Sequence, residues 1–376
     1  MMEVQKFIKA NGWAALELPP LNIKVRMYDK EQVAVLNYCQ IESPKNNPIT
    51  IECRSLILSY PDGNVISRSF DRFFNYGEMP DFYADFDINR SVVAEKADGS
   101  LIKVYFSPAT NQWEISTRSQ AFAEGPHAIG GVFRDWVLRA MNLTELEFQG
   151  AMVLFEQDVT MIMEYTGPEN RIVTPYEKSE MVMLAVRNNV TGEYEDAQHY
   201  VDLLAGYGMN IRMAHEYKLQ TFEDILVAAR DLPTLTEGYV VYDPVSGKRV
   251  KIKNPSYVAV HHLRENGVPS IKRIFALVLE NEQDEYLSYF EQDRKLFEPV
   301  VAEVEAYRQA LMSNWELVKH IEDQKEFALA VQKFKGTPFF FNAKKAKTSA
   351  VHEFDEAPVE KKIKQFNFKV AVEITE

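Results

Sequence analysis

A change in hydrophobic periodicity near residue 255 constrains the fold of this chain more than any other feature. Before it, short apolar stretches alternate with polar residues and end at turn-forming residues, a pattern typical of β-strands. These stretches are 49–58, 64–70, 101–106, 161–165, 181–186, 238–243 and 249–253, and helical patterns interrupt them near 121–143 and 221–230. Beyond it, residues 271–334 have helical spacing and are rich in Glu, Leu, Ala and Lys. The sequence therefore predicts a β-rich part followed by a helical part.

The chain is long enough for these two parts to form separate domains. Its 376 residues are 46% hydrophobic and 26% charged, as in ordinary globular proteins. We expect the boundary at Asn254–Pro255, because a residue that precedes proline is disfavoured in the α region. The predicted domains are therefore 1–255 and 256–376.

Charge and cysteine content narrow the classes of function. The net charge of −13 argues against a protein that coats nucleic acid with its whole surface, but it leaves room for a local basic groove. No run of about 18 apolar residues could span a membrane, and the N-terminus lacks the apolar core of a secretory signal. Cys39 and Cys53 are too few for a disulfide framework. We expect a cytoplasmic protein with both cysteines reduced and no membrane partner.

Lys96 is the first candidate for chemistry. It stands between the β-forming residues 91–95 and the turn-like residues 97–99, at the mouth of a predicted hairpin. Such a lysine is either a solvated residue beside a turn or a nucleophile that faces a phosphate-bearing substrate. A lysine has an ordinary pKa of about 10.4, so a nucleophilic one needs cationic neighbours or burial to lose its proton. The choice depends on the charged residues elsewhere in the β-rich part.

Two sets of basic residues could bind phosphates. Lys251 and Lys253 alternate along one predicted strand, so both side chains would lie on one face, either toward a polyphosphate or toward solvent. Arg54, Arg72 and Arg118 carry guanidinium groups that suit phosphate recognition, although any single arginine is more often a surface residue.

Two glutamates could hold a metal ion. Glu164 and Glu237 are each flanked by apolar residues of predicted strands. Each carboxylate would therefore emerge at the edge of a strand, near a cavity, where hard oxygen ligands can hold Mg²⁺ against phosphates. Taken alone, each is as readily an exposed glutamate.

The order of these motifs resembles that of the covalent nucleotidyltransferases, with their KxDG, EGxV and KxK motifs, and most closely the bacteriophage RNA ligase 1 family. The motifs are KADG at Lys96, STRS at Arg118, MEYTGPENRIV at Glu164, EGYVVY at Glu237 and KIK at Lys251 and Lys253. Further similar stretches are 52–55, 68–75, 168–173 and Tyr257, and the resemblance covers about residues 35–260. A KxDG motif alone is weak evidence for this resemblance, whereas five motifs in the same order are strong evidence.

The sequence departs from the family pattern in three places. Ala97 stands where relatives often carry glutamate, and Arg72 and Arg118 stand where the best-known relative carries lysine. The positive charge is kept, but arginine cannot exchange a proton as lysine can.

The resemblance implies an α+β fold, with an antiparallel-sheet nucleotidyltransferase domain over 1–255 and an all-α domain for RNA specificity over 256–376. It implies an ATP-dependent RNA ligase. Lys96 would attack the α-phosphorus of ATP to form lysyl-AMP, the AMP would pass to the 5′-phosphate of an RNA, and a 3′-hydroxyl would then displace it. The implied cofactors are ATP and Mg²⁺, which Mn²⁺ could replace.

The implied partner is single-stranded RNA or a nicked tRNA, whose repair would be the biological role. We expect a monomer that acts in the cytoplasm, the host's if a phage encodes it. Two rival functions stay open. An mRNA-capping-type guanylyltransferase would become labelled by GTP, although capping enzymes and DNA ligases usually append an OB-fold and this tail reads as helical. A non-catalytic RNA-binding protein on the same fold would not need the complete lysine and glutamate set.

The resemblance also implies residue roles. Lys96 would be the AMP-lysine nucleophile. The residues implied to bind the nucleotide are Arg54, Arg72, Phe74, Gly99, Arg118, Glu164, Glu237, Lys251 and Lys253.

Among these, Lys251 and Lys253 would neutralise the α-phosphate and help Lys96 to lose its proton. Glu237 would hold a metal, and Glu164 the ribose or a second metal.

Smaller roles follow for three others. Gly99 would permit the tight turn that exposes the lysine. Phe74 would pack beside the nucleotide or buttress Arg72. Arg54 would contact pyrophosphate or the RNA phosphate.

The segment 333–347 of the helical part interleaves lysines with phenylalanines, a mixture suited to a phosphate backbone and unpaired bases. We expect Lys344, Lys345 and Lys347 to contact RNA. The alternative is a packed core of phenylalanines 339–341 under a solvated lysine turn.

Overall fold

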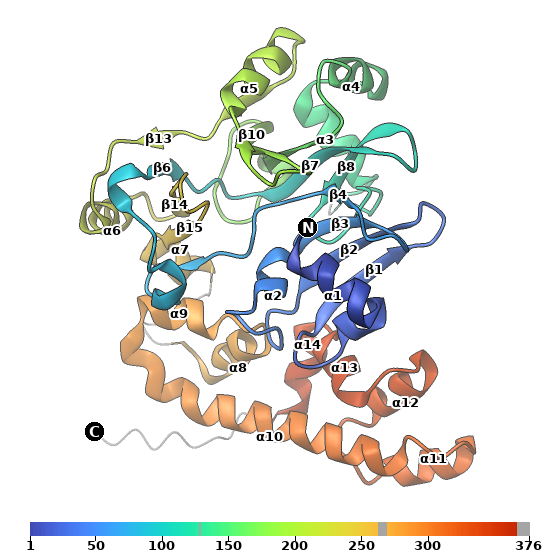
Figure 1. Cartoon of the computed structure of the whole chain (residues 1–376). Coiled ribbons are helices and arrows are strands. Elements are labelled where there is room, and N and C mark those ends of the chain that lie inside the picture. The colour runs from blue at the N-terminus through green and yellow to red at the C-terminus, as the bar shows by residue number, and fades with distance from the viewer. Residues whose placement is uncertain (128, 262–268, 367–376) are drawn as a thin grey trace. The chain divides into compact units, whose positions relative to one another are not determined.

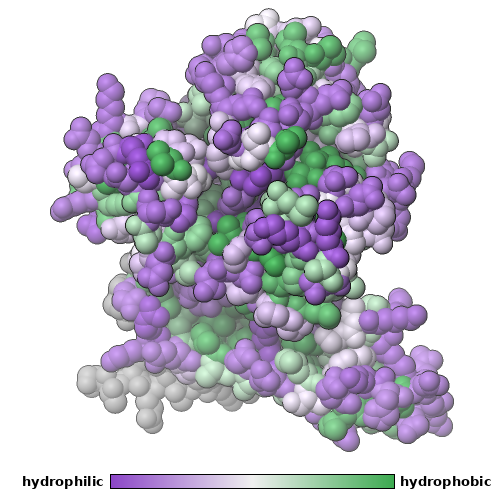
Figure 2. Space-filling model, viewed as in Figure 1, coloured by the Kyte–Doolittle hydropathy of each residue, from purple (hydrophilic) through white to green (hydrophobic). Residues whose placement is uncertain are grey.

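The computed structural model describes residues 1–127, 129–261 and 269–366. The chain divides into two compact units, 1–257 and 258–376. No helix in the described part of the chain is both long enough and apolar enough to cross a membrane. Hydrophilic side chains dominate the face drawn in Figure 2, and apolar side chains show between them in patches.

Three sheets form the framework of the first unit (Figure 1). Sheet A has the order β1–β2–β3–β4, with strands Ile23–Tyr28, Val33–Tyr38, Arg54–Ser59 and Val65–Ser67. Sheet B has the order β13–β6–β14–β15–β5, with strands Glu216–Tyr217, Val92–Glu95, Gly238–Tyr242, Arg249–Lys253 and Phe74–Asn75. Sheet C has the path β11–β10–β9–β7–β8, with strands Tyr194–Glu195, Glu180–Asn188, Val159–Thr166, Ser100–Ser107 and Gln112–Thr117, and β12 (Ile211–Met213) lies beside β10.

Most neighbouring strands in these sheets are antiparallel. The exceptions are the pair β10 and β12 and the pair β15 and β5, which run parallel. The α+β fold predicted for the chain is therefore confirmed.

Helices cover the sheets of this unit. They are α1 (Glu3–Asn11), α2 (Pro48–Glu52), α3 (Phe133–Met141), α4 (Glu145–Met152), α5 (Ala197–Gly206) and α6 (Phe222–Asp231), and α7 (Pro255–His261) follows at the boundary. Sequence-local caps start several of them: Thr144 and Glu147 form a capping box on α4, and Thr221 and Asp224 form one on α6. Side chains of α3, α4 and α5 build the main core against sheet C.

Helices alone form the described part of the second unit. They are α8 (Ile271–Leu279), α9 (Gln283–Tyr289), α10 (Arg294–Val318), α11 (Gln324–Val331), α12 (Thr337–Ala346), α13 (Ala350–Asp355) and α14 (Val359–Lys362). Their core contains the fully buried Phe297, Phe327 and Phe340.

Three local expectations were wrong. The predicted strand 49–58 begins as helix α2, because Asn47 accepts a hydrogen bond from the backbone of Ile49 and proline occupies the first helical position. The helical pattern predicted from 121 starts only at Phe133, after a segment with three glycines and a proline. The predicted hairpin at Lys96 does not form, since β6 belongs to sheet B and β7 to sheet C.

Candidate active site

Lys96 follows β6 directly and makes an ion pair in a partly enclosed setting. Its backbone N–H donates to the carbonyl of Gly238 on the neighbouring strand β14, at 2.8 Å. Its Nζ lies 2.6 Å from Oε2 of Glu237, and the Lys96 side chain is 22% exposed. The other oxygen of Glu237, Oε1, lies 3.3 Å from Nζ of Lys253. One buried carboxylate therefore joins the predicted nucleophile to a lysine of the KIK strand.

The register of sheet B brings these groups together. Gly238 pairs with Lys253, and Val240 pairs with Lys251, across β14 and β15. Gly238 has a φ of +138°, and a Cβ added there would meet the carbonyl oxygen of Ile252 at 2.2 Å. Only glycine tolerates both conditions, so the EG dipeptide fixes the carboxylate beside the lysines.

The DG dipeptide after Lys96 has a role different from the predicted one. Gly99 lies outside the left-handed backbone region, so a tight turn does not explain it. Instead, an added Cβ would meet the carbonyl oxygen of Tyr165 at 2.1 Å, and glycine permits this close approach to β9. Glycine was expected at this position because of a tight turn, and that reason was wrong.

Asp98 is a site residue whose role was not predicted from the sequence. Its Oδ2 accepts hydrogen bonds from the backbone N–H groups of Val173 and Thr174, at 2.9 and 2.7 Å, and its Oδ1 accepts one from the hydroxyl of Tyr257, at 2.9 Å. The backbone N–H of Asp98 donates to the hydroxyl of Tyr176 at 2.9 Å. Asp98 thus links the loop that carries Lys96 to the PENRIV segment. The presence of this segment among the motifs is the signal that could have identified Asp98.

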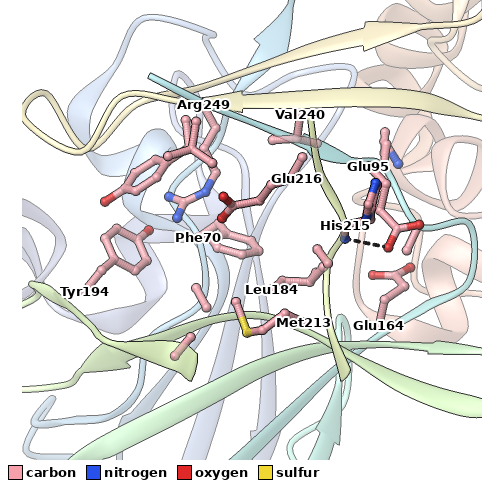
Figure 3. Close-up of a pocket in the computed structure, with 18 of the residues that line it drawn as sticks. Phe70, Glu95, Glu164, Leu184, Tyr194, Met213, His215, Glu216, Val240 and Arg249 are labelled. Atoms are coloured by element: carbon pink, nitrogen blue, oxygen red, sulfur yellow. Dashed lines mark hydrogen bonds between the residues drawn. The ribbon is translucent and has the colours of Figure 1, made fainter. Parts of the chain in front are cut away.

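A cavity of about 660 Å³ opens beside Lys96, lined mainly by residues of sheets B and C. Val240 lies on one side of it, and Leu184 and Met213 lie on the other (Figure 3). Arg249 lies toward one end and Glu164 toward the opposite end (Figure 3). An apolar slot with charged ends is the shape expected of a site for a nucleotide.

Glu95 is a second site residue that was not predicted from the sequence. It lines the cavity, and its Oε1 accepts hydrogen bonds from the backbone N–H of His215, at 2.8 Å, and from Nη1 of Arg212 (Figure 3). Its position directly before Lys96 on a predicted strand is the signal that could have found it.

Glu164 lies on β9 and lines the cavity. Burial raises the pKa of its carboxyl group to about 8, and the positive charge of Lys96 opposes this while the negative charge of Glu237 adds to it. These interactions show that Glu164, Lys96 and Glu237 share one electrostatic environment. Near neutral pH, Glu164 therefore carries a proton in a large part of the molecules.

Glu164 and Glu237 are suited to hold a divalent cation together with a bound phosphate. The described residues contain no group of three or more His, Cys, Asp or Glu that could hold a metal ion without other ligands. Mg²⁺, however, is usually held by one or two carboxylates with substrate phosphates and water. Two carboxylates in one environment fit this requirement.

The three predicted arginines come together around a residue that no motif marks, Tyr38. The Arg72 guanidinium lies 4.0 Å from the centre of the Tyr38 ring, and Nη2 of Arg118 donates to the Tyr38 hydroxyl at 3.1 Å. Burial alone would raise the pKa of this tyrosine, but the positive charges of Arg118, Arg54 and Lys251 outweigh it and lower the pKa. Four cations act on this one hydroxyl, so its surroundings are strongly positive and suited to an anion.

Phe74 is buried behind this cluster and is not among the residues that line the cavity. Its ring lies 5.4 Å from the Arg72 guanidinium and 5.3 Å from the ring of Phe82. Of the two roles expected for Phe74, the position fits the buttress of Arg72 and not packing against a nucleotide. Phe70 and Phe73 line the cavity instead, close to Arg54.

The lysines predicted to contact RNA differ in their surroundings. Nζ of Lys344 donates to the carbonyls of Ile321 and Glu322, at 2.7 and 3.1 Å, so this side chain is engaged in the helical unit itself. Lys345 and Lys347 are exposed.

The phenylalanines expected to pack beneath these lysines do so in part. Phe339 and Phe340 are buried, whereas Phe341 is 39% exposed.

Several known proteins resemble this chain in sequence. A family model described as RNA ligase matches residues 52–257. A protein of Autographa californica nuclear polyhedrosis virus, named for polynucleotide kinase and RNA ligase activities, is 31% identical over 316 residues, which are 80% of this chain and 43% of that protein. A protein of Thermovibrio ammonificans that is named for RNA ligase activity is 26% identical over 249 residues, which are 64% of this chain and 61% of that protein. This chain therefore spans less than two thirds of the length of each.

A solved archaeal ATP-dependent RNA ligase has a TM-score of 0.46 with this chain, at 13% identity, over 88% of this chain and 90% of that one.

Proposed function

Because this chain belongs to the RNA ligase family, whose model it matches over residues 52–257, we propose that it is an ATP-dependent RNA ligase that works through a lysyl-AMP intermediate. The observation that carries the proposal is the contact of Lys96 with Glu237 at the wall of a cavity large enough for a nucleotide. The contact between Glu237 and Lys253 supports it further.

In the first step, Nζ of Lys96 attacks the α-phosphorus of ATP. The new N–P bond forms as the bond from phosphorus to the bridging oxygen breaks, and pyrophosphate leaves with that electron pair. The amine must first lose a proton, and Glu237 is the carboxylate in hydrogen-bond contact with it. Lys253 and Lys251 neutralise the phosphate charge on the same strand face.

Binding energy for ATP comes from both ends of the cavity. In this proposal the base occupies the slot between Val240 and Leu184, and the phosphates extend toward Lys96 on the wall of the cavity. Glu164 and Glu237 would hold Mg²⁺ or Mn²⁺, which supplies further positive charge against the phosphates when bound. The arginine cluster around Tyr38 receives the outgoing pyrophosphate or the RNA phosphate.

In the next two steps, an oxygen of the RNA 5′-phosphate attacks the α-phosphorus of lysyl-AMP, and Lys96 leaves. A 3′-hydroxyl then attacks the activated 5′-end, and AMP leaves. The viral relative's name pairs this activity with a polynucleotide kinase, a class of enzyme that supplies 5′-phosphate ends. We extend the proposal to breaks in single-stranded regions, such as that of a nicked tRNA.

The test is incubation with α-labelled ATP or GTP and Mg²⁺, followed by denaturing electrophoresis and by a sealing assay with 5′-phosphorylated single-stranded RNA. The proposal expects labelling by ATP and circular or joined RNA. Labelling by GTP alone would indicate a guanylyltransferase. No labelling by either nucleotide would indicate an RNA-binding protein without catalysis.

A further inference from the structure

Strand β3 carries one extra residue opposite β2, next to the candidate active site. Leu36 pairs with Leu56 and Asn37 pairs with Arg54, so Ser55 has no partner in the ladder. This is a β-bulge, a feature that bends a strand and redirects the neighbouring side chain.

The bulge decides which way Arg54 points. In an unbroken strand Arg54 would share the face of Leu56, which packs in the core around helix α1. The extra residue moves Arg54 to the opposite face, that of Ile57. There it lines the cavity that also contains Lys96.

Ser55 has a costly backbone conformation. Its φ is +57°, in the left-handed region that residues other than glycine rarely adopt. The residue is also completely buried. Three contacts hold it in place. Its N–H donates to Oδ1 of Asn37 at 2.9 Å, its hydroxyl donates to the carbonyl of Thr117 at 3.3 Å, and its carbonyl accepts from Nζ of Lys103.

A buried lysine is an unusual partner for the carbonyl of Ser55. Lys103 lies in the middle of β7, is 0% exposed, and makes no ion pair with a carboxylate in the described part of the chain. Its Nζ also donates to the hydroxyl of Ser67 at 3.2 Å. Burial lowers the pKa of Lys103 well below its ordinary value, and the nearby charge of Arg54 lowers it further. A methionine of similar length would avoid the cost of burying an amino group.

We propose that Lys103 is a positioning residue for the ligase reaction. Its amino group holds the carbonyl of Ser55, this contact maintains the left-handed bulge, and the bulge keeps the Arg54 guanidinium in the cavity. The role of Arg54 in the reaction rests on the proposed function, whereas the link from Lys103 to the bulge does not.

Self-adenylation of the full-length chain tests the reaction part. Lys103→Met should raise the KM for ATP about tenfold and change the maximal rate less, because a misplaced arginine weakens phosphate binding. Arg54→Ala should act in the same direction. Lys103→Met should then add less than about twofold in the Arg54→Ala background, because residues that act through one another are not additive.

Ser55→Gly provides the rescue. Glycine adopts the bulge conformation without strain, so Ser55→Gly combined with Lys103→Met should restore most of the wild-type KM. This double variant also keeps the test valid if Lys103→Met alone does not fold. An additive effect of Lys103→Met on Arg54→Ala, or the absence of rescue by glycine, would overturn the proposal.

Amide hydrogen exchange tests the link from Lys103 to the bulge and needs no assay of activity. Exchange at residues 54–57 should be faster in Lys103→Met than in the wild type and should slow again with Ser55→Gly. Lys248→Met serves as the matched control, because Lys248 contacts the carbonyl of Phe82 and the carboxylate of Asp85 away from the bulge. If wild type fails to self-adenylate, the proposed function fails while this measurement still decides the role of Lys103. Unchanged exchange at the bulge would contradict it.

Discussion

The carboxylate of Glu237 lies between two lysines, with Oε2 at 2.6 Å from Nζ of Lys96 and Oε1 at 3.3 Å from Nζ of Lys253. An ammonium group paired with a carboxylate has no lone pair for attack. The ion pair must therefore open, and Lys96 must lose a proton, before lysyl-AMP can form. We therefore infer two roles for Glu237: it pairs with Lys96 before the reaction, and it takes part in the adenylation step.

The first prediction concerns Glu237. Glu237→Gln should slow self-adenylation by about 10²-fold or more, since both the ion pair and the proposed metal ligand are lost. The measurement is the single-turnover rate of AMP transfer at saturating ATP and Mg²⁺. Glu223→Gln, an exposed position in the first turn of α6, is the control and should keep the wild-type rate. Equal rates in the two variants would remove Glu237 from the mechanism.

The second prediction separates phosphate binding from a solvated strand face. Lys251→Ala and Lys253→Ala should each reduce self-adenylation by roughly 10²-fold, because in the proposed mechanism each removes a cation that stabilises the phosphates. Lys218→Ala, at an exposed site, should have no effect. Normal adenylation in both strand variants would show that the KIK strand is merely a solvated face.

The third prediction uses the pKa of Glu164, which burial raises to about 8. The unfolded value is about 4.3, so the folded state holds a proton that the unfolded state releases between these pH values. The stability that this proton contributes is fully present below about pH 4.3 and is lost as the pH rises through about 8. The free energy of unfolding of wild type should therefore fall across this window without metal.

Glu164→Gln should flatten that dependence, because the amide does not titrate. Thermal unfolding at pH 5.5, 7.0 and 8.5 compares the two proteins. The melting temperature of the variant should exceed that of the wild type by a margin that grows with pH. Parallel curves would show that Glu164 is not the titrating group.

The fourth prediction concerns the lysines at the C-terminal end of helix α12. Lys344→Ala should lower stability by about 1 to 2 kcal/mol, since its amino group donates to two carbonyls in the link between α10 and α11. Replacing Lys345 and Lys347 together should leave stability unchanged. It should also reduce the salt dependence of RNA binding by about one unit of slope per lost phosphate contact. An unchanged slope in this double variant would assign the helical tail to structure alone.

The sequence predicted the strand-rich and helical parts and the charged members of the site, because strand alternation and short motifs are local signals. Lys96, Glu237 and Lys253 were expected together, and they meet. The same local signals could not show that β6 and β7 lie in different sheets, since strand pairing depends on contacts far apart in the chain.

Other features could not be predicted from the sequence, for the same reason. The cluster around Tyr38 gathers residues from β2, β3 and β15, from the segment between β4 and β5 and from the position after β8, and no single stretch of sequence contains it. Lys103 reads as an ordinary strand lysine, and its burial appears only when sheet A packs on β7. The β-bulge at Ser55 depends on the register of β2, which alternation alone does not fix.

The most direct test is intact-mass and peptide-mapping spectrometry of the protein after incubation with ATP and Mg²⁺. One added AMP, labile to acid, is expected on the peptide that contains Lys96. No adduct is expected in Lys96→Ala or in Lys96→Arg, because a guanidinium stays protonated and cannot attack. An AMP adduct that persists in Lys96→Ala, or that maps to another residue, would contradict the assignment of Lys96 as the nucleophile.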